Sequence, residues 1–418
     1  MERRNFIIPD FGPLAGIRVV GAGSLIAMPF AISMMADFGA EVIQIERPGL
    51  GDNYRKFAPV KEIDGKSLGA AWAQEARNRL SLSLELNLAD EDVKDIFYRL
   101  IRESDIFVEN LVWLDKLGIY DDELLKVNPR LVIVHISGYG RAEFGGTEGT
   151  TGRASYDIIG QAYSGYAMCN GQEGEVPVLV KPGLNDYVTA LFALFAIQSA
   201  YISANRTGRG QVVDVSQVES MAKIMRESFT RNALGLGEVH RLGNKSEATL
   251  PWDCFKSRDD RYLAVGAVGE IVYARFIKAI GLDITEYPYA AAAKGAAAVH
   301  SPLGKKLERQ INIWFSAHDA EGIERIMAEA RVPCSIVHSP GACLSDPYYH
   351  SRNDFVEYAD QTTGADITAF GIAPKFSETP GKIWRGPPRL GQDTDAILGE
   401  ILHYSEGDIQ RFQRKRII

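Results

Sequence analysis

The chain has 418 residues, a formal net charge of −8 and 46% hydrophobic residues. This length exceeds the usual single-domain range and predicts two domains with enough volume for a buried core. The negative charge argues against nucleic-acid binding, which needs a basic field. The polar start at residues 1–6 carries no apolar segment, so we expect no signal peptide.

The chain contains four cysteines without the spacing of a metal site: Cys169, Cys254, Cys334 and Cys343. In a chain this long we expect reduced core thiols and a cytoplasmic protein. The seven histidines form no H-x-x-H or H-E-x-x-H pair, so we expect no metal site. The apolar run at 187–204 approaches membrane-spanning length, but Gln198, Ser199 and Ser203 interrupt it. We interpret it as a buried helix.

The first third of the chain alternates strand patterns with helix patterns. Apolar or alternating runs predict strands at 17–20, 41–45, 80–86, 106–108 and 131–136. Amphipathic patterns between them predict helices at 30–39, 90–102 and 121–127. Strands separated by helices predict an α/β fold, a Rossmann-like domain whose mainly parallel sheet is covered on both faces.

The rest of the chain shows a change in pattern. It first predicts helices at 156–168, 187–205 and 217–233, with a strand at 211–215. A different region then predicts strands at 262–266 and 334–337 and helices at 271–280 and 303–316. The alanine-rich stretch 290–299 fits either a helix or a mobile surface segment. The chain beyond Pro340 is proline-rich and loop-like, and it ends in helices predicted near 394–402 and 406–412. We predict a large domain in two parts, 1–224 and 341–418, and a smaller α/β domain at 225–340.

A glycine turn, Gly21-Ala-Gly23, lies between the first strand and the first helix. Such a turn lets backbone N–H groups approach a phosphate. Glu46 ends the next strand, where nicotinamide enzymes keep a ribose-binding acid. An NAD-dependent oxidoreductase is therefore one hypothesis, although Ile26 and Ala27 stand where the third fingerprint glycine belongs. A tight strand-to-helix turn explains the same residues.

The next candidates for phosphate binding and catalysis are charged residues near the ends of strands and helices. Four basic side chains lie near the ends of the predicted strands and either hold phosphates or face solvent: Arg47, Arg77, Arg79 and Lys116. Asp186 precedes the apolar helix, where it is either an N-cap or a nucleophile kept ionised by the helix field. Tyr156 and Asp157 begin the preceding helix and are further catalytic candidates, although the acid is otherwise explained as a cap or a surface residue.

Short motifs run through the chain in a fixed order. They are FGPLAGIRVV at 11–20, GAEVIQIE at 39–46, NPRLVIVHISGYG at 128–140, RASYD at 153–157, QAYSGY at 161–166, TGRGQ at 207–211, PKF at 374–376 and IWRG at 383–386. In this order and spacing the chain resembles the family III CoA-transferases, and most closely the branch that acts on carnitine-type and bile-acid substrates. The resemblance covers nearly the whole chain.

The resemblance implies an activity and a set of site residues. It implies that Asp186 attacks an acyl-CoA thioester to form a mixed anhydride and then an aspartyl-CoA thioester, from which a free carboxylic acid takes the CoA. Acyl-CoA is then a substrate, and no cofactor is permanently bound. The implied CoA contacts are Leu25, Ile26, Ala27, Arg47, Leu84, Asn110 and Lys116. The segment 110–116 is shorter than in carnitine-type relatives and lacks their extra lysine.

The resemblance also defines alternatives and partners. Alpha-methylacyl-CoA racemases share the fold and the aspartate, but they use a His-Asp pair where this chain has Tyr156-Asp157. Without the histidine there is no second base, which favours transfer over racemisation. A CoA-binding protein without catalysis is disfavoured by Asp186. The relatives form homodimers of two interlocked, ring-shaped subunits. We therefore expect a homodimer with neither nucleic-acid nor membrane partners, in which the segment from about residue 374 wraps along another surface.

Overall fold

The computed structural model describes residues 5–111 and 113–418. The first four residues of the polar start, and Val112 in the segment 110–116, lie outside the described residues. The chain divides into two compact units. The large unit comprises Met1–Tyr166, Leu179–Phe229 and His350–Ile418, and the small unit comprises Ala167–Val178 and Thr230–Tyr349. The domain bounds drawn from the sequence remain a prediction.

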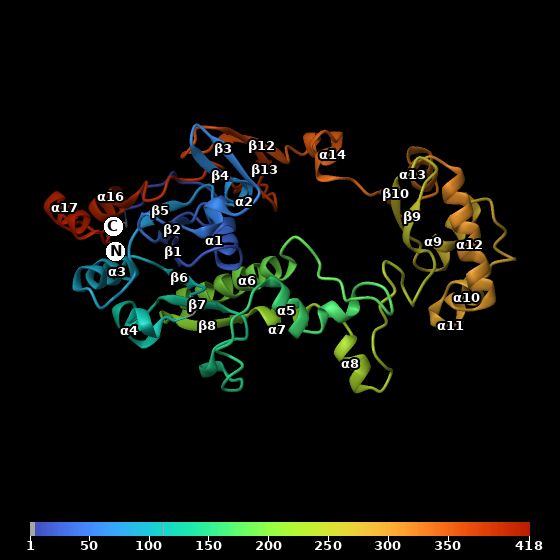
Figure 1. The fold of residues 1–418 in the computed structure, drawn as a ribbon, viewed down its shortest axis with the longest axis horizontal. Coiled ribbons are helices and arrows are strands. Elements are labelled where there is room, and N and C mark those ends of the chain that lie inside the picture. The colour runs from blue at the N-terminus through green and yellow to red at the C-terminus, as the bar shows by residue number, and fades with distance from the viewer. Residues whose placement is uncertain (1–4, 112) are drawn as a thin grey trace. The chain divides into compact units, whose positions relative to one another are not determined.

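The large unit is built on a six-stranded sheet with the order β5-β2-β1-β6-β7-β8 (Figure 1). All five neighbouring pairs are parallel. The strands are β1 (Arg18–Ala22), β2 (Glu41–Glu46), β5 (Leu80–Ser83), β6 (Ile106–Glu109), β7 (Val132–Ser137) and β8 (Gln211–Ser216). The predicted α/β fold with a mainly parallel sheet is confirmed, and each of these six strands overlaps a strand predicted from the sequence.

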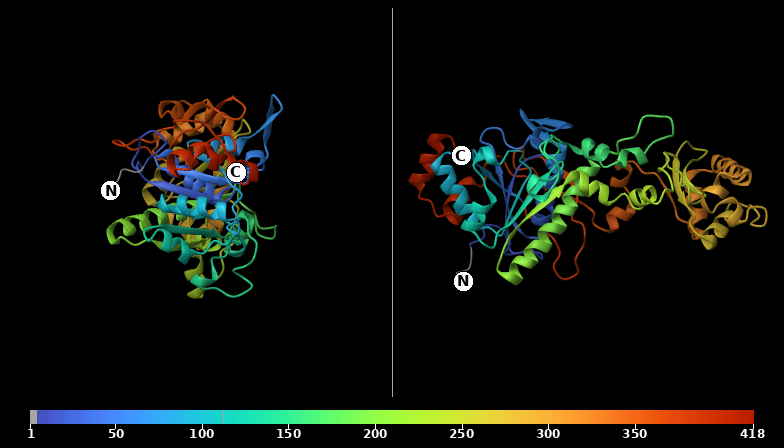
Figure 2. Two further views of the ribbon diagram at one scale, coloured as in Figure 1. Left: turned by 90° about the vertical axis from the view of Figure 1, so that its left-hand side faces the viewer. Right: turned by 90° about the horizontal axis from the view of Figure 1, so that it is seen from below.

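Helices cover both faces of this sheet because successive strand residues point to opposite sides. Val20 and Ile43 belong to one apolar core, whereas Val19 and Val42 belong to the other. The right-hand view in Figure 2 shows the long helix α6 (Leu184–Thr207), in green, along the strands. The large unit also contains α1 (Ala27–Asp37), α2 (Ala70–Glu75), α3 (Glu91–Arg102), α4 (Asp121–Val127), α5 (Asp157–Tyr163), α7 (Gln217–Lys223), α16 (Thr394–Ala396), a π-helical turn (Ile397–Ile401) and α17 (Glu406–Lys415).

Two elements differ from the sequence predictions in ways that matter for the site. The helix predicted to begin at residue 187 begins at Leu184, so Asp186 lies inside its first turn. The helix predicted over 217–233 is broken: α7 ends at Lys223 and α8 (Ser228–Ala233) begins five residues later. Arg226, with φ of +50°, has a left-handed backbone that a continuous helix does not allow.

The chain beyond Pro340 is more regular than predicted. It forms α14 (Pro340–Leu344), α15 (Pro347–Ser351) and an antiparallel hairpin of β12 (Phe355–Ala359) and β13 (Asp366–Phe370). A second hairpin, β3 (Val60–Ile63) with β4 (Lys66–Gly69), was also not predicted. Both hairpins are short and few of their residues are buried, so they carry little of the apolar signal that marks a strand. The C-terminal helix α17 lies beside α3, where Arg411 pairs with Asp92 (Figure 1).

The small unit has its own sheet and core. Its antiparallel sheet has the order β11-β10-β9, with β9 (Trp252–Lys256), β10 (Tyr262–Gly266) and β11 (Cys334–Ile336). Its helices are α9 (Glu270–Ala279), α10 (Tyr289–Ala292), α11 (Gly295–Val299), α12 (Pro302–Ala317) and α13 (Ala320–Glu329). The alanine-rich stretch therefore forms two short helices, and Ala292 and Ala298 are buried.

Short 3-10 turns elsewhere lie at Asn53–Lys56, Asp115–Leu117, Ala142–Phe144 and Tyr166–Cys169.

Within the described residues, α6 is the helix whose length and composition would allow a membrane span. Its buried residues pack in one apolar core with α1, β6 and β7. Alanines at the contact, such as Ala193 and Ala200, let the helix approach the sheet closely. One face of α6 therefore packs in the core, but the prediction of a buried helix holds only for that face: 33% of its most apolar stretch is buried, and Leu191, Phe195 and Ile202 are exposed.

Candidate active site

A cavity of about 990 Å³ lies in the large unit, at the carboxyl ends of the central strands. The turn after β1, the last residue of β6 and the end of β7 all contribute to its wall. Ligands of open parallel sheets bind at this edge, because the loops there converge and strand polarity brings helix N-termini close. Six of the predicted site residues line the cavity: Leu25, Ile26, Ala27, Asn110, Tyr156 and Asp186.

The turn between β1 and α1 is held in place by two side chains. Asn110 accepts a hydrogen bond from the Ser24 N–H (3.0 Å) and donates to the Ser24 carbonyl (2.9 Å). Asp52 Oδ1 accepts the N–H of Leu25 (3.1 Å), which has a left-handed backbone at φ +69°. Both polar atoms of the Asn110 amide therefore bond the backbone of the turn, so Asn110 shapes this wall of the cavity.

Four predicted residues do not line the cavity. Arg47 is exposed and pairs with Glu85 (3.1 Å). Lys116 places its amine 4.6 Å from the centre of the Trp113 ring. Leu84 is only 1% exposed because its side chain belongs to the apolar core under the sheet. Asp157, the fourth, contacts the start of α6.

Asp157 supplies the cap of α6. Helix α6 follows Gly183, which has a left-handed backbone and no side chain to offer as a cap. Asp157 Oδ1 accepts the backbone N–H groups of Asn185 (2.7 Å) and Asp186 (3.3 Å), and its Oδ2 accepts from Gln161 (2.7 Å). The N-cap interpretation of Asp186 was therefore wrong: the capping acid comes from α5, and the Asp186 carboxylate remains available for other contacts.

The Asp186 carboxylate is half-buried in the cavity wall. Its Oδ1 accepts a hydrogen bond from Gln217 Nε2 at 2.5 Å, whereas Oδ2 has no donor among the described residues. Burial and the neighbouring Asp157 carboxylate raise the pKa of Asp186 to about 7, and the Gln217 hydrogen bond opposes this rise. The sequence-based expectation that the helix field keeps Asp186 ionised is therefore too simple. A helix terminus contributes about 0.3–1 kcal/mol, less than one pKa unit, which burial and a like charge outweigh.

Tyr156 stands at the mouth of the same cavity. It precedes the first residue of α5, and its side chain is 68% exposed with no capping hydrogen bond. Trp113 and Tyr120 are also exposed and line the cavity. These aromatic faces are available to a ligand with an apolar or cationic group.

A buried ionic cluster borders the cavity and was missed from the sequence. His135 lies opposite Glu109 in the register of β6 and β7, with Nδ1 2.5 Å from Glu109 Oε1 and Nε2 3.0 Å from Asp121 Oδ2. Burial disfavours the charged imidazole, but the hydrogen bonds and charges of Asp121 and Glu109 outweigh it and raise the pKa of His135 to about 9. The signal that could have found this cluster was a polar residue near the end of each of two apolar strands.

Gln217 was missed as well. It is the first residue of α7, directly after Ser216, whose hydroxyl accepts the N–H of Glu219 as the helix cap. No motif marks a glutamine at this position. Its importance follows only from its contacts with Ser155 and Asp186.

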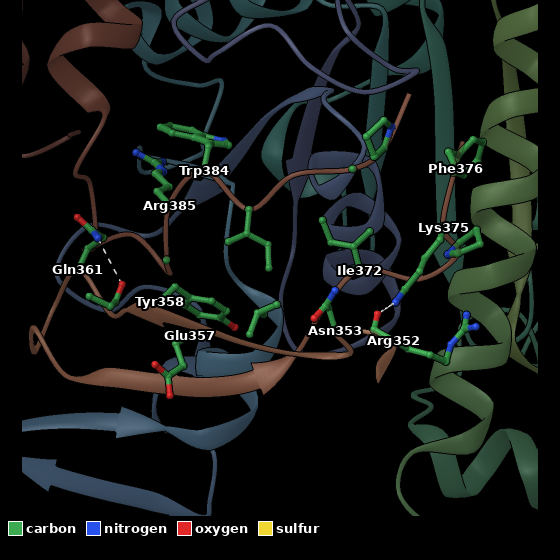
Figure 3. A pocket seen from close by; sticks show the side chains of 17 residues that line it. Arg352, Asn353, Glu357, Tyr358, Gln361, Ile372, Lys375, Phe376, Trp384 and Arg385 are labelled. Atoms are coloured by element: carbon green, nitrogen blue, oxygen red, sulfur yellow. Dashed lines mark hydrogen bonds between the residues drawn. The ribbon is translucent and has the colours of Figure 1, made fainter. Parts of the chain in front are cut away.

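A second cavity of the large unit, about 1070 Å³, lies along the C-terminal segment (Figure 3). Tyr358, Phe376, Trp384 and Arg385 line it. The Lys375 amine donates to the Arg352 carbonyl across one end of it. None of the predicted site residues lies in its wall.

Comparisons with known proteins give the family of the chain. A family model described as CoA-transferase family III matches residues 14–394. A curated relative, bile acid CoA-transferase BaiK of Clostridium scindens, is 33% identical over 423 residues, which cover 98% of this chain and 90% of that protein.

Solved structures share the fold. A CAIB/BAIF family protein from Brucella suis has a TM-score of 0.79 at 22% identity, covering 94% of this chain and 100% of that chain. The orthorhombic form of Rv3272 from M. tuberculosis has a TM-score of 0.77 at 20% identity, covering 93% and 100%. The family model, which spans most of the sequence, and the relative at 33% identity show that the chain belongs to CoA-transferase family III and is an enzyme of that class.

Proposed function

We propose that this enzyme transfers CoA from an acyl-CoA thioester to a free carboxylic acid, with Asp186 as the nucleophile. The observation that carries the proposal is the Asp186 carboxylate in the wall of a cavity of about 990 Å³, with one oxygen held by Gln217 and the other without a donor in the described chain. The NAD-dependent oxidoreductase hypothesis was based on the glycine turn at 21–27. The family model matches this turn as part of a CoA-transferase, so the hypothesis has no remaining support.

The proposed reaction uses two exchanges at Asp186. The free oxygen attacks the thioester carbonyl carbon, the C–S bond breaks, and the CoA thiolate leaves a mixed anhydride behind. The thiolate then attacks the aspartyl carbonyl carbon and releases the donor acid as a carboxylate. An acceptor carboxylate reverses these steps and leaves with the CoA. Covalent catalysis of this kind splits one difficult exchange into easier ones. Acyl-CoA enters as a substrate, with no permanently bound cofactor.

The proposed acceptor is a bile acid or a carnitine-type betaine. The relative at 33% identity is described as a bile acid CoA-transferase, which supports the first. Exposed aromatic rings at the cavity, those of Trp113, Tyr120 and Tyr156, suit either a large apolar skeleton or a quaternary ammonium group.

The test is an exchange screen with two readouts. The enzyme is incubated with isotopically labelled acyl-CoA and a panel of bile acids, betaines, aryl acids and hydroxy acids, and new CoA thioesters are identified by mass spectrometry. The peptide that contains Asp186 is examined after rapid quench for a mass increment that hydroxylamine removes. No new thioester with any acid, together with exchange of the α-proton of a 2-methylacyl-CoA, would instead support a racemase.

We further propose that the enzyme is a homodimer of interlocked subunits and acts in the cytoplasm. Helix α6 supports the dimer, because Leu191, Phe195 and Ile202 share one face of it and are 49%, 73% and 64% exposed. Large exposed apolar patches on a soluble chain are typical of protein interfaces. None of the four described cysteines is in a disulfide, which fits a reducing compartment.

A further inference from the structure

Gln217 connects Asp186 to a third side chain. It is 7% exposed, so its amide has little access to water. Its Nε2 lies 2.5 Å from Asp186 Oδ1, and its Oε1 accepts a hydrogen bond from Ser155 Oγ at 2.9 Å. Ser155, Asp186 and Gln217 all belong to the wall of the same cavity.

Ser155 determines which end of the amide faces Asp186. An ionised carboxylate only accepts hydrogen bonds, so it needs the NH₂ end of the glutamine. The Ser155 hydroxyl donates to the carbonyl end and thereby keeps the NH₂ end turned toward Asp186. Ser155 is itself tightly placed, because a Cβ on Gly138 would lie 2.2 Å from the Ser155 Cβ. The donor is therefore oriented before any substrate binds.

A donor at Asp186 Oδ1 affects the reaction only if Asp186 is the nucleophile, so the inference rests on the proposed function. When the CoA thiolate attacks the aspartyl carbonyl carbon, the electron pair of the C=O bond moves onto the oxygen that did not attack. When the tetrahedral species collapses, that pair returns and the bond to the departing carboxylate breaks. Because Oδ2 is the oxygen without a donor, Oδ1 is the one that carries this transient charge.

We propose that Gln217 is the oxyanion donor for the attack on the aspartyl carbonyl, and that Ser155 is its positioning residue. A donor already placed at the atom where charge develops needs no reorganisation during the reaction, which is why such donors accelerate acyl transfer. Gln217 acts on the second step, at the aspartyl carbonyl. The first step places its oxyanion on the donor acyl group, away from Asp186 Oδ1.

The experiment compares Gln217→Leu, Ser155→Ala and a control, Gln74→Leu. The side-chain amide of Gln74 bonds to the backbone of Phe370, and Gln74 is not part of the wall of the cavity of about 990 Å³. Leucine at 217 keeps the volume and loses the donor. We expect kcat to fall on the order of 100- to 1000-fold in Gln217→Leu. Ser155→Ala should lose about five- to tenfold, as for one hydrogen bond. The control should keep wild-type activity, and CoA binding should be unchanged in all three.

The covalent adduct on Asp186 distinguishes a failure of this inference from a failure of the proposed function. After rapid quench, the wild-type Asp186 peptide should carry the mass of CoA, whereas the Gln217→Leu peptide should carry the mass of the acyl group, because its second step is slowed. A wild-type enzyme without any adduct on Asp186 would overturn the proposed nucleophile. The wild-type enzyme could form the adduct while Gln217→Leu keeps the wild-type rate and carries the mass of CoA. That result would overturn the role of Gln217 and leave the proposed nucleophile standing.

Discussion

The Asp157 carboxylate accepts the backbone N–H of Asp186 across 3.3 Å, so the acid that caps α6 lies beside the proposed nucleophile. The same oxygen, Oδ1, also accepts the N–H of Asn185 at 2.7 Å. Asp157 therefore has two separable effects: its oxygens hold the first turn of α6, and its charge helps to raise the pKa of Asp186. A neutral residue that keeps an oxygen acceptor would remove the second effect and retain the first.

For this reason Asp157→Asn and Asp157→Ala should differ. The wild-type kcat/KM should rise with pH through about 7, where Asp186 ionises. Asp157→Asn removes a like charge, lowers the pKa of Asp186 and moves this acid limb to lower pH. Asp157→Ala should do the same and also cost about 0.5–2 kcal/mol of stability, as a lost cap does. The pH profiles and urea denaturation of both variants check this; identical acid limbs in all three proteins would contradict the electrostatic effect.

Asp186→Asn should abolish exchange and leave CoA binding nearly intact. Loss of a nucleophile lowers the rate on the order of 10⁴-fold or more. Because the folded-state pKa of Asp186 is raised from 3.8 to about 7, wild-type stability is lost as the pH rises through that window. The variant lacks this loss, so its melting temperature relative to wild type should be higher at pH 8 than at pH 4. Activity near the wild-type level would mean that Asp186 has only a structural role.

His135→Leu should destabilise the enzyme in a pH-dependent way. The folded-state pKa of His135 is raised to about 9, so its stabilising contribution is complete below its unfolded value of 6.5 and disappears as the pH rises through 9. Removing one partner of a buried ion pair costs about 3–5 kcal/mol, here because Glu109 loses its imidazole. Denaturation should show that the free energy of unfolding of the variant is far below that of wild type at pH 6.5 and less far below it at pH 10. An equal deficit at both would show that the charge on His135 contributes nothing.

Gly23→Ala should weaken CoA binding. A Cβ at this position would lie 1.7 Å from Asn110 Oδ1, and Gly23 has a φ of +147°. Asn110 would have to leave the Ser24 backbone, which reshapes the turn in the cavity wall. We expect the Kd for CoA, measured by calorimetry, to rise at least about tenfold, equivalent to 1.4 kcal/mol. Gly399→Ala, where the added methyl group meets nothing within 4 Å, is the control and should bind normally.

The proposed dimer should persist on dilution. Analytical ultracentrifugation at nanomolar concentration should show the dimer mass, because subunits with obligate interfaces often have no stable folded monomer. Phe195→Lys places a charge on the exposed apolar face of α6 and should disrupt assembly or folding. Ile313→Lys changes an equally apolar exposed residue of the small unit and serves as its control. A folded, active wild-type monomer would contradict the interlocked arrangement.

The sequence by itself determined the parallel sheet and the family. The apolar runs at 106–108 and 131–136 are encoded in consecutive residues, and strands that alternate with helices allow few arrangements besides a covered parallel sheet. The motifs also identified Asp186 as the candidate nucleophile. These features could be predicted because each depends on residues that are neighbours in the chain or on their order along it.

Only the tertiary structure decided what surrounds Asp186. Gln217 and Ser155 are 31 and 62 positions from the residues they contact, and neither carries a local pattern. The pairing of His135 with Glu109 depends on the register of two strands, which single-sequence periodicity does not specify. The raised pKa of Asp186 likewise comes from burial and from Asp157 on another helix. Hydrogen bonds and charges between distant segments depend on how the sheet and helices pack, so they appear only once the chain is folded.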